Sequence, residues 1–247
     1  MDLVLVGDGI TPGRLAEVAD QVKAHVGAGM AVAAANGRST PPAAADRRLL
    51  IASPERVALA LDGGERWICE DGMAPAWSER LAAVFAHGRS PLFAWCVRSS
   101  TAYGVPIVDP LARHLVARGV LSEASAWAFK AGLTEAIANA CIHGNLEIDN
   151  RDRVDPWRFS IFVETVHLRL TDPRYGGRGI MVVLTPDESG LCAELWQECG
   201  RIPLSAAEAR LPTADRPAGR GMALMAAVAK SVDVLADGRC VRLVFPL

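Results

Sequence analysis

Short apolar runs separated by polar turns dominate the first hundred residues of the chain. These runs predict strands at 3–6, 30–35, 49–52, 66–69 and 92–97. Between the first two runs, Thr11 and Pro12 form a helix start, and apolar residues then recur at helical spacing up to Val26. Another helix is expected at 77–86. Strands that alternate with helices predict an α/β module with a parallel sheet.

Small, polar and proline residues interrupt this pattern near residue 100. Residues 99–110 read SSTAYGVPIVDP, which is typical of a linker. We therefore expect two domains, an α/β module at 1–100 and a second domain at 101–247.

The second domain mixes helices with hairpins. Its pattern predicts, in order, a helix at 125–144, a strand at 159–170, a solvated turn at 172–179, a hairpin at 181–196, a helix at 222–229 and a hairpin at 232–245. The segment 145–179 is long, and we expect it to cover a site or to form a partner surface.

The helix at 125–144 carries an unusual polar stripe. Glu135, Asn139 and His143 are spaced four residues apart, which places them on one helical face among alanines. The opposite face carries residues expected in the core, namely Leu133, Ile137, Ala140 and Cys141. A solvated face would carry mixed charges instead. The stripe is therefore expected to line a metal and a phosphate, or else to bind a neighbouring segment of the same chain.

Composition narrows the class of protein. Hydrophobic residues make up 51% and charged residues 22% of the chain, which is typical of a folded protein. The net charge of −2 argues against nucleic-acid binding by charge alone. No apolar run approaches the ~20 residues of a membrane span. The six cysteines form no C-x-x-C pair, so we expect reduced thiols in a cytoplasmic protein.

Several motifs together carry a family resemblance. They are LTEAIANA at 133–140, His143-Gly144, GRGMAL at 219–224 and the ending VDVLADGRCVRLVF. In this order they resemble the ATP-binding domain of the GHKL superfamily, which includes gyrase and the histidine kinases. The closest resemblance is to anti-sigma-factor serine kinases. It covers about residues 108–247 and implies a two-layer α/β sandwich, with helices on one face of a mostly antiparallel sheet.

The resemblance implies a role for each motif residue, with ATP and Mg²⁺ as cofactors. Asn139 matches the family's Mg²⁺ ligand, and its amide oxygen suits a hard cation that is shared with phosphate oxygens. Glu135 matches the residue that acts as general base or orients the attacking group. His143 is expected near the phosphates or holding the following loop. The phosphates themselves would be wrapped at a helix N-terminus by Gly219, Arg220 and Gly221.

The adenine-binding motif of the family, D-x-G-x-G, is degenerate here. Residues 196–202 read WQECGRI. Strand alternation puts Gln197 at the Asp position, whereas counting back from Gly200 puts Glu198 there and Ile202 in place of the second Gly. The third Gly of the later motif is Ala223. An unpaired adenine donor would cost ~1–3 kcal/mol, so weak or absent ATP affinity is expected.

The first half weakly resembles a receiver domain, on the order of its elements alone. A receiver needs a phosphorylatable Asp at the end of its third strand, and here that strand ends at Ala52-Ser53. Only Asp8 follows the first strand. We therefore expect a docking or dimerisation module without aspartyl phosphorylation.

Together these patterns predict a bacterial cytoplasmic signalling protein. Its activity would be Mg·ATP-dependent phosphorylation of Ser or Thr on a regulatory partner, such as a sigma factor or an anti-anti-sigma-like protein, or sequestration of that partner. The alternative is a nucleotide-free pseudokinase that acts as a binding or phosphotransfer scaffold. The sequence implies no membrane or nucleic-acid partner and leaves a homodimer open.

Overall fold

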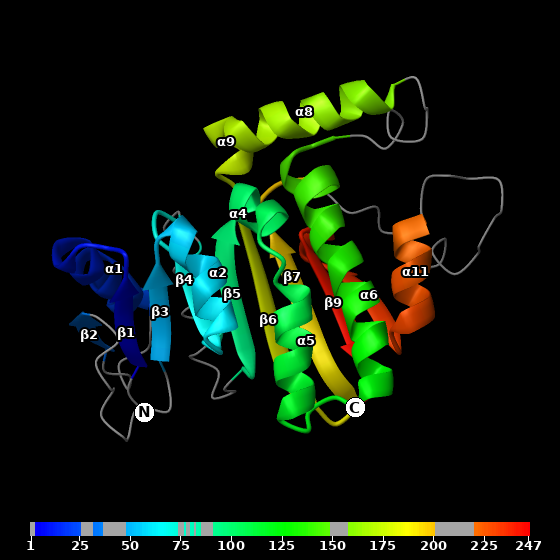
Figure 1. The fold of residues 1–247 in the computed structure, drawn as a ribbon, viewed down its shortest axis with the longest axis horizontal. Helices are drawn as coiled ribbons and strands as arrows, with labels where there is room; N and C mark the ends of the chain where they lie inside the picture. Colours follow the sequence, from blue (N-terminus) through cyan, green and yellow to red (C-terminus); the bar gives the residue numbers. More distant parts are fainter. Residues whose placement is uncertain are drawn as a thin grey trace. The chain divides into compact units, whose positions relative to one another are not determined.

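The protein divides into two compact units, Met1–Val97 and Arg98–Leu247, each described here by itself. The computed structural model describes residues 3–25, 32–36, 48–73, 77, 80–81, 83–84, 91–148, 158–200 and 220–247. Figure 1 shows both units in sequence colours, from blue at the N-terminus to red at the C-terminus.

The first unit is built on a parallel sheet. Its strands are β1 (Leu3–Asp8), β2 (Val32–Asn36), β3 (Arg48–Ala52), β4 (Trp67–Glu70) and β5 (Phe93–Arg98). They lie in the order β2-β1-β3-β4-β5, which is the order of a doubly wound open sheet. Its helices include α1 (Pro12–His25) and α2 (Pro54–Asp62). The expected α/β module with a parallel sheet is therefore confirmed.

Continuous apolar runs mark these strands because helices cover both faces of a parallel sheet. All four residues of β4 are buried, and so are five of the six residues of β5. The described residues of the predicted helix at 77–86 are helical, and its other residues lie outside the described part of the chain. No carboxylate stands at the end of β3, where Ala52 is followed by Ser53.

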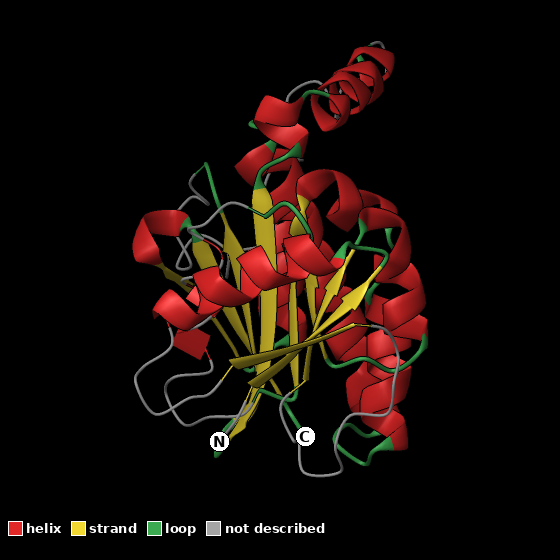
Figure 2. Cartoon of the chain, turned by 90° about the vertical axis from the view of Figure 1, so that its left-hand side faces the viewer, coloured by secondary structure: helices red, strands yellow, loops and turns green. Residues whose placement is uncertain are grey.

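The second unit has an antiparallel sheet with a helical layer. Its strands are β6 (Gly179–Asp187), β7 (Gly190–Gln197), β8 (Ser231–Leu235) and β9 (Cys240–Phe245), in the order β6-β7-β9-β8. The helices α5 (Val108–Ala117), α6 (Glu123–Asn139) and α11 (Arg220–Val228) cover one face of this sheet (Figures 1 and 2). The expected two-layer sandwich is therefore confirmed.

The central helix α6 is fixed by its cap and by its core face. Ser122 at the N-cap accepts a hydrogen bond of 3.0 Å from the backbone N–H of Ser125. Phe129 is fully buried and meets Phe245 of β9 edge to face, with 5.3 Å between the ring centroids. The four residues predicted for the core face, Leu133, Ile137, Ala140 and Cys141, are all buried. The polar face is thereby turned away from the sheet.

Two elements correct the sequence interpretation. Residues 99–110 were expected as a linker but contain α4 (Ser99–Gly104) and the start of α5, because Ser99 and Ala102 are buried. Residues 159–170 were expected as a strand but form the helix α8 (Phe159–Thr171). The prediction of a strand was wrong because large apolar side chains occur on both faces of α8, which hides the helical period. Phe162 and Val166, four residues apart, pack into a cluster with Ile142.

Candidate functional site

The middle of α6 brings together two of the predicted polar residues and one glycine of α11. Glu135 and Asn139 are both half-buried. A Cβ atom at Gly221 would overlap Glu135 Oε1, and it would lie 2.7 Å from Glu135 Cδ and 3.0 Å from Asn139 Nδ2. A side chain at position 221 would therefore have to displace the carboxylate of Glu135 from this close approach. A carboxylate, an amide and the first turn of a helix meet at this point.

The other two residues predicted for this turn are less fully described. Arg220 begins α11, and nothing is described of its side chain. Gly219 lies outside the described residues, as does Ile202. The placement of the predicted phosphate loop therefore rests on Gly221 alone.

His143 lies beyond the point where α6 changes its geometry. Residues Ala140–Asn145 form a π-helix, η1, whose wider turn ends the four-residue stacking that the sequence pattern assumed. The half-buried ring of His143 places Nδ1 2.6 Å from the carbonyl oxygen of Ile148. Of the two positions expected for His143, this contact corresponds to holding the loop that follows the helix.

Gln197 is the last residue of β7 and is fully buried. A Cβ atom at Gly144 would lie 2.7 Å from Gln197 Nε2, and a Cβ atom at Gly200 would lie 2.7 Å from the Cα of Gly144. Gln197 Nε2 donates a long hydrogen bond of 3.5 Å to the carbonyl of Gly238. Its Oε1 has no hydrogen-bond partner among the described residues. The end of β7 therefore holds a buried acceptor against the end of the central helix.

Glu198, the other residue considered for the Asp position, has a different environment. It is exposed, and its Oε2 accepts a hydrogen bond of 2.8 Å from the backbone N–H of Gly179 at the start of β6. The two registers left open by the sequence thus differ in structure: Gln197 is turned inward against Gly144, whereas the side chain of Glu198 contacts a strand end.

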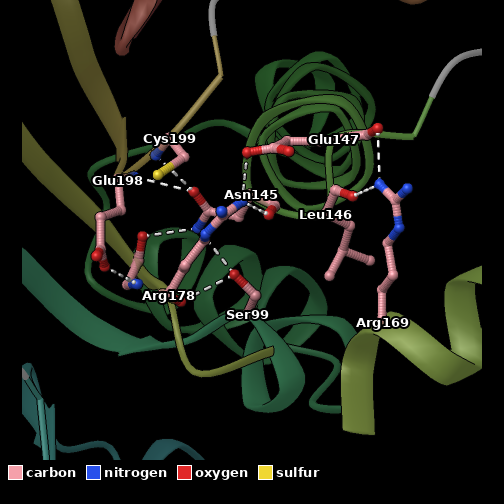
Figure 3. Close-up of polar contacts among 9 residues, drawn as sticks. Ser99, Asn145, Leu146, Glu147, Arg169, Arg178, Glu198 and Cys199 are labelled. Atoms are coloured by element: carbon pink, nitrogen blue, oxygen red, sulfur yellow. Dashed lines mark hydrogen bonds and ion pairs between the residues drawn. The ribbon is translucent and has the colours of Figure 1, made fainter. Parts of the chain in front are cut away.

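Sequence reasoning missed Asn145, the last residue of the π-helix. Asn145 is fully buried, and its Nδ2 donates to Ser99 Oγ and to the carbonyl of Gly179, each at 2.8 Å. Its Oδ1 accepts from the backbone N–H groups of Glu198 and Cys199, each at 3.0 Å. Figure 3 shows these groups converging on the amide. The only sequence signal was one polar residue among apolar neighbours at a helix end.

Two arginines close the end of the π-helix from outside. Arg178 donates to the carbonyl of Asn145 and forms an ion pair of 2.8 Å with Glu147. Arg169 of α8 donates to the carbonyl of Leu146 and, at 2.8 Å, to the carbonyl of Glu147 (Figure 3). These bonds satisfy carbonyls that a helix end leaves free.

An aromatic ring joins the two arginines. The guanidinium carbons of Arg169 and Arg178 lie 4.9 Å and 4.8 Å from the centroid of Tyr175. Tyr175 belongs to the short helix α9 (Pro173–Gly176). The expected solvated turn at 172–179 is therefore wrong for Arg178, whose side chain is only 18% exposed.

Cys141 on the core face is fully buried, and burial raises the pKa of its thiol to about 12. All six cysteines are free. Among the described residues, no three His, Cys, Asp or Glu side chains gather as metal ligands.

The geometry agrees with what a comparison of the chain with known families finds. The model of the histidine kinase-like ATPase domain matches residues 99–245, which is more than half of the chain. The protein belongs to this family. A comparison with curated proteins found no match. In the part of the chain that the structure describes, none of the helices combines the length and the apolar character of a membrane span.

Proposed function

We propose that this chain is an ATP-binding signalling protein that phosphorylates serine or threonine on a regulatory partner. The observation that carries the proposal is the meeting of Glu135, Asn139 and Gly221 on the polar face of α6. The first turn of α11 leaves backbone N–H groups free, and these favour a phosphate. The lack of a Cβ at Gly221 lets Glu135 and Asn139 lie directly against this turn.

The residues present suit both a magnesium ion and a nucleotide. The amide oxygen of Asn139 is a ligand type that Mg²⁺ accepts together with phosphate oxygens, and the ion would neutralise phosphate charge. Glu135 is placed to orient or deprotonate an attacking hydroxyl group. The Oε1 of Gln197, which has no hydrogen-bond partner among the described residues, is an acceptor of the kind that the exocyclic amine of adenine requires.

The partner in this proposal is a regulatory protein of the anti-sigma pathway type. The first unit would serve as its docking module, because its strand order is that of a receiver domain while β3 ends at Ala52 without a phosphoacceptor. A dimer of the chain is compatible with this role. The proposed site of action is the bacterial cytoplasm.

Titration calorimetry with Mg·ATP on the wild type and on Asn139→Ala tests the proposal. The wild type is expected to bind, and Asn139→Ala is expected to lose at least about tenfold in affinity, or about 1.4 kcal/mol, because the metal loses its protein ligand. The matched control is Thr134→Ala, an exposed position on the same helix, which should leave the affinity unchanged. Equal affinities for all three proteins would contradict the assignment of Asn139.

A nucleotide-free pseudokinase is the second candidate, and one observation favours it. Gln197 is fully buried against Gly144, so a base could reach its Oε1 only if the segment after β7 moves. The same titration separates the candidates, since absence of heat with the wild type would support the scaffold and overturn the kinase.

A further inference from the structure

Asn145 connects the end of the π-helix to three other segments of the second unit through one amide. Its two donors reach Ser99 in α4 and Gly179 at the start of β6. Its acceptor takes the backbone N–H groups of Glu198 and Cys199, directly after β7. Asparagine and glutamine alone offer two donors and two acceptors on one side-chain group. Every hydrogen-bonding position of this amide is therefore used.

We propose that Asn145 is the positioning residue that sets the base end of the nucleotide site, and that Arg178 holds it in place. This inference rests on the proposed function. The two N–H bonds fix the segment that leads away from Gln197, and Gly200 in that segment contacts Gly144. The amide of Gln197 also lies against Gly144. The position of the base-facing acceptor therefore depends on Asn145.

The phosphate end is too far away to share this dependence. Asn145 follows Asn139 by six residues, which is about 9 Å along a helix with a rise of 1.5 Å per residue, and somewhat less in a π-turn. Asn139 instead meets Gly221 of α11. A change at Asn145 should therefore alter recognition of the base and leave recognition of the phosphates nearly intact.

The second part of the proposal concerns Arg178, which follows the short helix α9. Arg178 donates to the carbonyl of Asn145, pairs with Glu147 and lies over the ring of Tyr175. Arg174, from the same turn, also faces Tyr175, at 5.8 Å, but its side chain is 81% exposed and pairs with Asp172. Arg174 is thus a control of the same residue type, four residues before Arg178 and against the same ring.

The experiment compares two probes, Mg·ATP and Mg·tripolyphosphate, by titration calorimetry on the full chain. Tripolyphosphate has the phosphates without the base. Asn145→Ala and Arg178→Ala are expected to weaken Mg·ATP by at least about tenfold and Mg·tripolyphosphate by less than about twofold. Arg174→Ala should change neither. Circular dichroism first establishes that each variant is folded.

A conservative variant guards against a purely structural effect. Asn145→Asp keeps an acceptor for the N–H groups of Glu198 and Cys199 but loses both donors, so it should unfold at a lower temperature and still retain the preference for Mg·ATP. Equal weakening of both probes by Asn145→Ala, or no weakening, overturns the positioning role while leaving the proposed function intact. A wild type that binds neither probe overturns the proposed function and this inference with it.

Discussion

The middle of α6 and the π-helix that follows it belong to one continuous helix, yet they handle polar groups in opposite ways. Glu135 and Asn139 are half-exposed and face the glycine at the start of α11. Asn145 is fully buried, and all of its hydrogen-bonding capacity is used within the protein. The first region leaves its polar groups partly open to solvent, as the proposed ligand site requires, whereas the second uses its polar group to hold other segments in place.

Alanine substitutions at Gly144 and Gly221 test the difference between the two regions, and we expect them to have the largest effects. In Gly144→Ala the new methyl group would overlap the amide of Gln197, whose side chain is fully buried. Overpacking of this kind costs about 1–3 kcal/mol, more than the helix propensity that alanine gains. We expect the free energy of unfolding in urea to fall by about 2 kcal/mol. An unchanged urea midpoint would show that the end of the helix is looser than described.

Gly221→Ala should do the reverse. Its methyl group would meet the end of the Glu135 side chain, which is half-exposed and can turn aside. We expect the unfolding free energy to change by less than about 0.5 kcal/mol, as is usual for surface substitutions. Displacing Glu135 and crowding the helix N-terminus should weaken Mg·ATP by about tenfold in calorimetry. A large loss of stability with intact binding would invert the assignment of the two regions.

The burial of Cys141 in the π-helix should have a smaller effect, a loss of stability at high pH. Burial raises the pKa of Cys141 from 9.0 to about 12, so the folded state keeps this proton while the unfolded chain loses it. Stability from this group is complete below pH 9 and declines as the pH rises from 9 towards 12. Between pH 8 and pH 10 the wild type should lose about 1 kcal/mol more than Cys141→Ala.

Urea unfolding of both proteins at the two pH values measures this difference. The other thiols contribute equally to both proteins and cancel. Parallel pH dependence in the two proteins would mean that water reaches Cys141.

Much of the architecture could be predicted from the sequence because burial leaves a local pattern. The strands of the first unit are short apolar runs, and the core face of α6 follows the helical period of Leu133, Ile137 and Cys141. The pairing of Glu135 with Asn139 is visible for the same reason, since residues four apart on a helix are neighbours. The contact of Glu135 and Asn139 with Gly221 agrees with the family resemblance, which places the motifs at 133–140 and 219–224 at one site.

The remaining features depend on contacts between distant segments. Helix α8 exposes Ile161 and Leu168 and buries Phe162 and Val166, so apolar side chains on both faces mask the helical period. Asn145 owes its role to groups at positions 99, 179 and 198–199, and no short pattern records such a junction.

The contact between Gly144, Gln197 and Gly200 has a consequence for how this protein can vary. Gly144 precedes Gln197 and Gly200 by more than fifty residues in the sequence, but all three residues are in close contact. A larger residue at 144 can be accommodated only by a smaller one at 197. Relatives of this chain should therefore exchange these residues together, as a correlated set rather than one by one.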